Sequence, residues 1–490
     1  MLIKLEGAGP LYQRLYRAIR NQILEGRLRA GERLPSTRGL AQELGVSRNV
    51  VMLAFEQLVA EGHLVGHTGS GTYVSSELPE GLRWKSSRRV LPSRLGPATA
   101  APRLSSYGRR LSEADLQLPG RKRERLPYDF RHDLISDSLS ETWRRLLAGR
   151  ARAGRSTSLT YGPEQGHPPL RETLARYRGR NREVLCRANQ ILITDGSQQA
   201  FDLIARVLID PGDAVALEEP HFIRARQCFR AHGADVVGVP VDAEGLEIRK
   251  LSLIVGQPRL VVVTPSHQYP TGVVMPETRR NGLLGWAEQN HALIVEDDYD
   301  SGLRDGPRSI EAIQSLDTGD RVLYVGTFSR VLFPSLRIGY VVLPRPLVEP
   351  MARAKLLADR QSPTLTQEAL TEFIEEGHFE RHARKLRERV DTLRKILLDA
   401  IDRNLGTDVQ VAGNGSGLHG HIWCRHVPEK RAEEGVRAAA KEGVGRRSVS
   451  SNYLTPPARA GLILRFGGLG NEEIRVGTKR LGQVIRRFSS

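Results

Sequence analysis

Residues 322–340 read VLYVGTFSRVLFPSLRIGY: an apolar run, a turn of small residues, and two arginines, Arg330 and Arg337. An apolar strand that ends in Gly-Thr-Phe-Ser presents a hydroxyl group and free backbone N–H groups at its carboxyl end, and such groups can bind an anion. Arg337 can return to the same edge and add a forked cationic contact. The pattern is typical of a phosphate seat, but a buried strand followed by an ordinary basic turn has the same pattern. The neighbouring sequence has to separate these two interpretations.

Four further apolar runs precede this stretch, and each is followed by enough chain for a helix or a crossover. Their apolarity is continuous rather than alternating, which indicates strands covered on both faces, as in a mainly parallel sheet. We therefore predict an α/β domain with a mainly parallel central sheet over residues 127–490. Together with VLYV (322–325), the predicted strands are ILIT (191–194), AVAL (214–217), LVVV (260–263) and ALIVE (292–296).

Polar residues follow these runs, at the sheet edge where α/β proteins bind ligands. Residues 195–198, DGSQ, open a helix whose first N–H groups would face an anion. Phe222 offers a flat ring, Asp297 a carboxylate and Tyr299 a phenol. This set suits pyridoxal phosphate, which needs a phosphate cradle, an aromatic neighbour and a carboxylate at its pyridine nitrogen. A structural domain without a ligand is the weaker alternative, because so many polar groups would be costly to keep at one sheet edge.

The motifs GSQQA, EEPHF, TPSHQYPTG, EDDYD and GTFSRVLFPSLRIGY occur in this order and resemble the aminotransferases of the large pyridoxal-phosphate fold. The resemblance implies that the domain binds pyridoxal 5'-phosphate, with Asp297 at the pyridine nitrogen, Phe222 against the ring and Tyr299 at the ring hydroxyl. It also makes Arg224 and Arg465 candidates to bind the carboxylate of an amino acid. The phosphate contacts that it implies are Ser197, Gln198, Thr327, Ser329 and Arg337.

Arg330 departs from the aminotransferase pattern. The resemblance assigns its position, directly after Gly-Thr-Phe-Ser, to the lysine that forms a Schiff base with the cofactor. A guanidinium has a pKa above about 12 and is a poor nucleophile, so Arg330 cannot form that bond. The nearest lysine in the sequence is Lys355. Tyr269 is a second departure, where the family often has an asparagine.

Three outcomes stay open for such a pocket. It holds pyridoxal phosphate without a covalent link, it prefers a preformed cofactor–amino-acid adduct or the pyridoxamine form, or it binds another anion. In each case the sequence leaves the domain without a catalytic residue at the Schiff-base position, and transamination is in doubt.

Residues 9–76 have the pattern of a winged helix-turn-helix. Apolar residues recur at helical spacing in three segments, Ser36 or Thr37 can cap the second and Ser47 the third, and Gly45 separates them. Such a pair of helices places the start of the second one in the major groove of DNA. The glycine-rich EGHLVGHTGSGTYV that follows is typical of a two-stranded wing. The segment resembles the GntR regulators, and the DNA contacts that this resemblance implies are Arg38, Ser47, Arg48, Asn49, Thr68 and Gly69.

Residues 77–126 lose apolar periodicity and are rich in arginine, proline, serine and glycine. Such a stretch cannot bury enough apolar surface to offset the entropy of ordering it, so we expect a basic, flexible linker. Its basic runs could contact DNA phosphates without reading sequence. A linker that only keeps the protein soluble is an equal alternative.

The composition agrees with this division. A chain of 490 residues is expected to form more than one domain, and its formal net charge of +17 points to a polyanionic partner. Three widely separated cysteines indicate neither a disulfide framework nor a zinc site, and we expect no metal. The sequence shows neither a signal peptide nor an apolar run long enough to span a membrane, so we expect a cytoplasmic protein.

Taken whole, the chain resembles the MocR/GabR regulators. The resemblance implies a homodimeric, DNA-binding transcription regulator whose aminotransferase-like domain senses a small ligand, either pyridoxal phosphate or an amino acid or both. The alternative is an active pyridoxal-phosphate-dependent aminotransferase with an accessory DNA-binding head. The missing lysine argues against that alternative.

Overall fold

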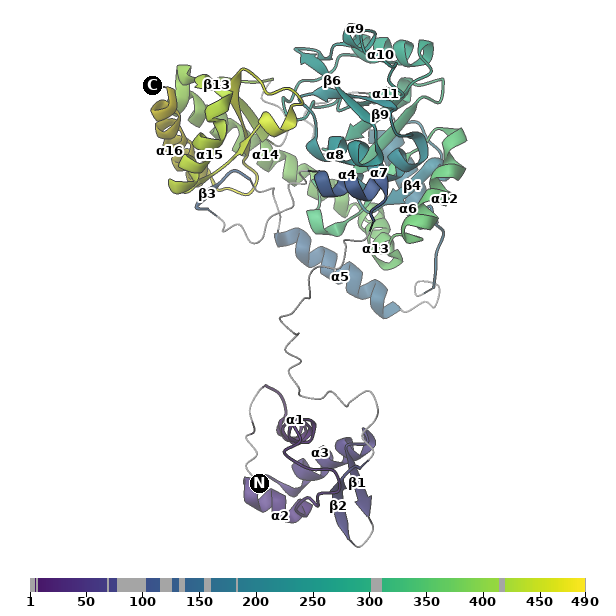
Figure 1. Ribbon diagram of the computed structural model, residues 1–490, viewed down its shortest axis with the longest axis vertical. Coiled ribbons are helices and arrows are strands. Elements are labelled where there is room, and N and C mark those ends of the chain that lie inside the picture. Colours follow the sequence, from purple (N-terminus) through teal and green to yellow (C-terminus); the bar gives the residue numbers. More distant parts are fainter. Residues whose placement is uncertain are drawn as a thin grey trace. The chain divides into compact units, whose positions relative to one another are not determined.

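The computed structural model describes residues 5, 8–67, 70–76, 103–114, 126–131, 137–153, 160–181, 184–300, 311–413 and 419–489. They form two compact units, which divide between Arg103 and Leu104 (Figure 1).

The small unit is a winged helix. Its elements are α1 (Leu11–Leu24), α2 (Thr37–Leu44), α3 (Arg48–Ala60) and the antiparallel strands β1 (Leu64–His67) and β2 (Gly71–Val74). The Ser36 hydroxyl accepts a hydrogen bond from the Gly39 N–H at 3.1 Å, which confirms the predicted cap of α2. The Ser47 hydroxyl caps α3 in the same way, and Gly45 ends α2 in the left-handed conformation. Apolar side chains from all five elements form one core, so the predicted helix-turn-helix and wing are confirmed.

The large unit is built on an eight-stranded sheet with the order β4-β11-β10-β9-β8-β5-β6-β7. The central strands β10, β9, β8, β5 and β6 run parallel to one another, whereas β11 runs antiparallel between β10 and β4, and β7 runs antiparallel to β6. The predicted mainly parallel sheet is confirmed, and all five predicted strands lie in it. The strands are β4 (Ile191–Thr194), β5 (Ala214–Glu219), β6 (Asp235–Asp242), β7 (Gly245–Leu246), β8 (Leu260–Val263), β9 (Leu293–Asp298), β10 (Val322–Thr327) and β11 (Gly339–Val342).

Helices account for most of the remaining described residues of this unit. Their bounds are α4 (Ser106–Glu113), α5 (Asp137–Ala153), α6 (Pro168–Asn181), α7 (Ser197–Leu208), α8 (Ile223–His232), α9 (Ile248–Leu251), α10 (Glu277–Gln289), α11 (Ile313–Leu316), α12 (Val348–Asp359), α13 (Thr364–Glu375), α14 (His378–Leu405), α15 (Ala432–Lys441) and α16 (Asn471–Ser489). None of the helices that the structure describes is long and apolar enough to cross a membrane.

Both faces of the sheet are covered by helices. Successive residues of a strand point to opposite faces, so neighbouring residues of one strand report on the two faces separately. Val215 and Leu217 of β5 join the apolar cluster that includes α7 and α8. Ala216, between them, joins the cluster that includes Leu283 and Trp286 of α10. Figure 1 shows α7 and α8 on one side of this part of the sheet and α10 on the other. The continuous apolarity of the predicted strands follows from this double burial.

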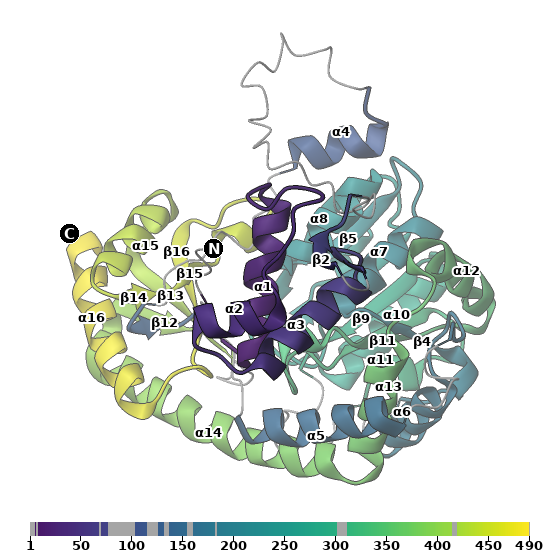
Figure 2. The same cartoon turned by 90° about the horizontal axis from the view of Figure 1, so that it is seen from below.

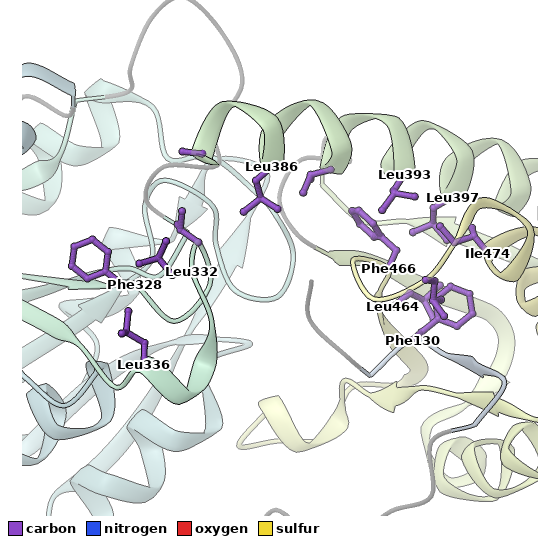
Figure 3. Packing of buried hydrophobic residues seen from close by; sticks show 14 of the residues in the cluster. Phe130, Phe328, Leu332, Leu336, Leu386, Leu393, Leu397, Leu464, Phe466 and Ile474 are labelled. Carbon is purple, nitrogen blue, oxygen red and sulfur yellow. The ribbon is translucent and has the colours of Figure 1, made fainter. Parts of the chain in front are cut away.

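A second, antiparallel sheet lies in the C-terminal part of the large unit, and we did not predict it. Its order is β12-β13-β16-β15, and α14 runs along both parts of the unit (Figure 2). Figure 3 shows Leu386 of α14 toward Leu332, in the loop after β10, and Leu397 toward Phe466, which follows β16, all in one buried cluster. The strands are β12 (Val409–Val411), β13 (His419–Pro428), β15 (Arg447–Ser448) and β16 (Arg459–Arg465), and a separate parallel pair is formed by β3 (Tyr128–Asp129) and β14 (Val444–Gly445).

The helix α4 corrects the prediction of an unstructured linker for residues 103–114. The Ser105 hydroxyl caps it by accepting from the Gly108 N–H at 3.0 Å. The Arg110 guanidinium donates to the Ala231 carbonyl at 2.8 Å, and the Tyr107 ring lies 5.0 Å from the His232 ring, both at the end of α8. Contacts with the end of α8 therefore order this segment, although its own composition predicts no regular structure. Most of the remaining predicted linker lies outside the described residues.

Candidate functional site

The ends of the central strands surround a cavity of about 240 Å³. All eight residues predicted to contact a cofactor line it: Ser197, Gln198, Phe222, Asp297, Tyr299, Thr327, Ser329 and Arg337. Three residues outside that prediction complete the wall: Tyr269, Arg330 and Pro334. Residues from five separate stretches of the chain thus meet at one edge of the sheet, as expected for the carboxyl ends of parallel strands.

One end of the cavity has the properties of an anion seat. Ser197 and Gln198 begin α7, where the backbone N–H groups have no preceding helical carbonyl to bind. The Arg337 guanidinium lies against this turn and donates to the Asp195 carbonyl. Gly196 makes the approach possible, since it has a φ of +86° and a Cβ there would lie 2.7 Å from Arg337 Nη2. The sequence signal for this seat is therefore the glycine together with Arg337.

The hydroxyl groups of the β10 turn complete the seat. The Thr327 hydroxyl donates to the Ser329 hydroxyl at 3.1 Å and accepts from the Ser329 N–H at 3.2 Å. This contact fixes both side chains at the cavity wall, beside the predicted phosphate position.

The other end carries a buried acid and a buried phenol, each with an oxygen that has no hydrogen-bond partner in the described part of the chain. Asp297 is 4% exposed, and its Oδ1 has no hydrogen-bond partner among the described residues. The same holds for the Tyr299 hydroxyl. Burial, together with the charges of Asp298 and Asp300, raises the pKa of Asp297 to about 8. Burial also raises the pKa of Tyr299. Buried polar atoms without partners are costly, and a ligand with a cationic ring nitrogen and an adjacent hydroxyl would satisfy both.

Aromatic rings form the wall between these two ends. The Phe222 and Tyr269 rings meet edge to face with centroids 5.7 Å apart, and Tyr269 meets Tyr299 in the same way at 5.7 Å. Burial acts to raise the pKa of Tyr269, but the positive charges of Arg465 and Arg330 outweigh it and lower that pKa. Tyr269 is thus a wall residue that the implied contacts did not include, although its place in TPSHQYPTG marks it.

Arg330 lines the same cavity. Its positive charge opposes the rise in the pKa of Asp297 and of Tyr299, both of which line the cavity with it. Because a guanidinium stays protonated, Arg330 supplies a fixed cation and hydrogen-bond donors at this point. Among the residues that line the cavity there is no lysine.

The two candidate carboxylate-binding arginines occupy different positions. Arg465 ends β16, and its Nη2 donates to the Tyr269 hydroxyl at 3.5 Å, so it lies directly behind the cavity wall. Arg224 is in the first turn of α8 and donates to Gln227 at 3.2 Å. Neither lines the cavity itself, and Arg465 is the one that touches a wall residue.

The comparison with known proteins agrees with both units. Residues 131–458 match the family of class I and II aminotransferases, and residues 11–74 match the gntR family of bacterial regulatory proteins. The probable rhizopine catabolism regulatory protein MocR of Rhizobium meliloti is 35% identical over 98% of this chain and 95% of its own length. The chain belongs to the MocR-type family of transcription regulators.

A second regulator matches nearly the whole chain, and two solved aminotransferase structures match most of it. The transcriptional regulator TauR of Rhodobacter capsulatus is 33% identical over 98% of this chain and 97% of its own. Among solved structures, the Pyrococcus horikoshii kynurenine aminotransferase superposes with a TM-score of 0.68 at 27% identity, covering 79% of this chain and 95% of that one. The α-aminoadipate aminotransferase LysN of Thermus thermophilus gives 0.68 at 29%, covering 74% and 92%. The aminotransferase fold of this MocR-type regulator belongs to a family whose enzymes depend on pyridoxal phosphate.

The small unit of this MocR-type regulator presents its predicted DNA contacts to solvent. Ser47, Arg48 and Asn49 lie exposed at the start of α3, the second helix of the helix-turn-helix, and Arg38 lies exposed on α2. This is the arrangement in which a helix start enters the major groove. The other two predicted contacts, Thr68 and Gly69, lie outside the described residues.

Proposed function

We propose that this MocR-type regulator binds DNA through its winged helix and senses a pyridoxal-phosphate-type ligand in its large unit without bonding to it covalently. The single observation that carries the proposal is one cavity, which has an anion seat at one end, two buried groups at the other whose oxygens lack partners among the residues that the structure describes, and Arg330 in place of an amine.

The residues present fit the cofactor. Ser197, Gln198, Thr327, Ser329 and Arg337 would hold the phosphate. Asp297 would hold the ring nitrogen and Tyr299 the ring hydroxyl, which would satisfy their partnerless oxygens. Phe222 would pack against the ring. When bound, such a cofactor supplies an aldehyde that reacts with amines and a ring that withdraws electrons.

Arg330 decides which part of that chemistry remains. A protonated guanidinium does not attack an aldehyde, so the chain has no amine at the place where the ring's reactive carbon would lie. The ligand is therefore held by ionic and hydrogen-bond contacts and is free to exchange, which suits a sensor. An enzyme that turns over amino acids would need the missing amine, and we propose that this protein has no transaminase turnover.

The natural effector is an amino acid or related carboxylate, alone or joined to the cofactor. Arg465, behind Tyr269, is the guanidinium best placed to bind that carboxylate. Two relatives are named for rhizopine catabolism and for pyridoxine biosynthesis.

We further propose that the large unit forms a homodimer. Tyr161 is 75% exposed with the Arg360 guanidinium 3.8 Å from its ring centroid, and Leu357 is 88% exposed. Apolar and stacked groups of this kind on one surface suit a protein interface better than water.

A mobility-shift assay with the DNA upstream of the protein's own gene tests the proposed function. At about 150 mM salt, the protein should bind that DNA in preference to random duplex, because salt weakens the phosphate contacts that both DNAs share and leaves the base contacts to discriminate. Adding pyridoxal phosphate with an amino acid should change the shift. Arg48→Ala should weaken specific binding by about tenfold or more, as loss of one base-reading arginine does.

Two outcomes would contradict the proposal. One is equal binding of operator and random DNA. The other is a wild-type protein that converts amino acids to keto acids catalytically.

A further inference from the structure

Lys355 is completely buried on α12, although it does not line the cavity. Its ammonium group donates to three acceptors: Asp359 Oδ2 at 2.6 Å, Gln199 Oε1 at 2.9 Å and the Ser362 hydroxyl at 3.1 Å. An ammonium has three N–H donors, so this set uses all of them. The nearest lysine in the sequence to Arg330 is therefore held in place and does not stand in for the missing amine.

The acceptors of Lys355 lead directly to the anion seat. Gln199 is the third residue of α7, and its Oε1 also accepts from the Asp195 N–H at 2.8 Å. The Ser362 hydroxyl donates to Asp195 Oδ1 at 2.6 Å. The Asp195 carbonyl in turn accepts from the Arg337 guanidinium. Asp195 has four atoms that can form hydrogen bonds, and this network fixes three of them: the backbone nitrogen, the backbone oxygen and Oδ1.

The network also fixes Asp359 against α7. The Gln199 amide donates to Asp359 Oδ2 at 2.5 Å, the same oxygen that accepts from Lys355. A buried ammonium is stable only with a paired carboxylate and satisfied donors, and both conditions are met here. The ammonium group of Lys355 and its hydrogen-bond partners therefore fix the turn of residues 195–199 on the side away from the cavity.

We infer that Lys355 is a positioning residue for the phosphate seat: through Gln199, Ser362 and Asp195 it fixes the start of α7 and the guanidinium of Arg337 where the phosphate of the ligand binds. This inference rests on the proposed function, since it concerns the anion that the proposed ligand carries. Lys355 touches neither the ligand nor the cavity wall, and its positive charge adds to the field at the start of α7.

Binding of pyridoxal phosphate, of pyridoxal and of inorganic phosphate by the full-length protein tests the inference. Lys355→Met keeps most of the side-chain volume and removes the charge. It should weaken binding of pyridoxal phosphate and of inorganic phosphate by about tenfold, the loss that misplacing one charged hydrogen bond produces. Binding of pyridoxal, which lacks the phosphate, should change by less than about twofold on the same scale. A general loosening of the fold would weaken all three ligands alike.

Ser362→Ala provides a second variant that preserves the charge and volume of the site. It removes the hydroxyl that joins Lys355 to Asp195, and it should give the same selective loss in smaller measure. Lys395→Met, on an exposed position of α14, is the matched control and should change none of the three affinities.

The outcomes separate this inference from the proposed function. The positioning role alone would be overturned if Lys355→Met and Ser362→Ala lost affinity for pyridoxal and for pyridoxal phosphate equally. It would also be overturned if neither variant lost affinity for pyridoxal phosphate. A wild-type protein that binds neither pyridoxal phosphate nor inorganic phosphate would overturn the proposed ligand, and the positioning role with it.

Discussion

Arg330 determines what the pocket can do at the level of single residues. In the proposed function, the residues around it would seat each part of a pyridoxal-phosphate-type ligand, whereas its own side chain would not bond to the aldehyde. On that proposal, this one position would separate recognition of the ligand from chemistry on it. This conclusion could be drawn from the sequence, because the motif GTFSR places the arginine directly.

The buried carboxyl of Asp297 lowers the stability of the ligand-free protein. Its pKa of about 8 lies above the value of about 3.9 in an unfolded chain. A carboxyl with a raised pKa in the folded state favours folding below its unfolded pKa, and that contribution is lost as the pH rises to its folded pKa. At neutral pH the folded protein therefore keeps Asp297 mostly protonated while the unfolded chain ionises, which favours unfolding, and above about pH 8 the buried ionised carboxylate carries the full cost in the ligand-free protein.

Asp297→Asn should stabilise the ligand-free protein at pH 8.5. The melting temperature of the large unit should rise by about 2 °C or more, and the gain should shrink as the pH falls towards about 4. The same variant should lose the stabilisation that pyridoxal phosphate gives to the wild type, because the ring nitrogen has no carboxylate. Thermal melts at two pH values, with and without ligand, measure both effects. A variant that melts below the wild type at pH 8.5 without ligand would refute this account of Asp297.

At the level of elements, the site depends on where strands end and helices begin. The strands that could be predicted are those buried on both faces, because only these are continuously apolar, as ILIT of β4 and LVVV of β8 are. The residues directly after them could be assigned to the site for the same reason. The second sheet could not be predicted, since β13 reads HGHIWCRHVP and mixes histidine and arginine with its apolar residues.

The helix α4 was missed for a different physical reason. It has no buried residues and is only eight residues long, so its two apolar residues, Tyr107 and Leu111, form a pattern too short to predict a helix. What orders it is Tyr107 against His232 and Arg110 on the Ala231 carbonyl. Contacts between distant parts of a chain leave little trace in the local pattern. The buried Lys355 network was missed likewise, since its members are spread over residues 195–362.

Arg110→Ala should free α4 from the large unit. An isolated helix of eight residues is unstable in water, so loss of its anchor should speed amide hydrogen exchange in residues 104–114 by about tenfold. Exchange measured by mass spectrometry on the full chain gives the rate. Arg109→Ala is the matched control, because Arg109 is the exposed neighbour on the same helix. Equal exchange in both variants would show that the Arg110 contact does not hold the helix.

At the level of the whole molecule, two compact units carry two different chemistries. The small unit offers exposed arginines and an asparagine at a helix start, which suits DNA, and the net charge of +17 favours the same partner. The large unit offers a cavity with an anion seat at one end and an aromatic wall, which suits a small anionic ligand with a ring. A protein that joins these two functions in one chain can couple ligand binding to DNA binding, provided that the ligand binds reversibly.

The central claim is that pyridoxal phosphate binds without a covalent link. It is tested most directly by titrating the wild type and Arg330→Lys with pyridoxal phosphate, followed by borohydride reduction and intact mass analysis. Equilibrium dialysis before reduction should show that both proteins bind the cofactor. After reduction and denaturation, Arg330→Lys should carry one added phosphopyridoxyl group, because a lysine amine restores the covalent link. The wild type should show no added mass. A wild-type chain that gains one such group under the same conditions, or that binds no pyridoxal phosphate before reduction, would contradict the account.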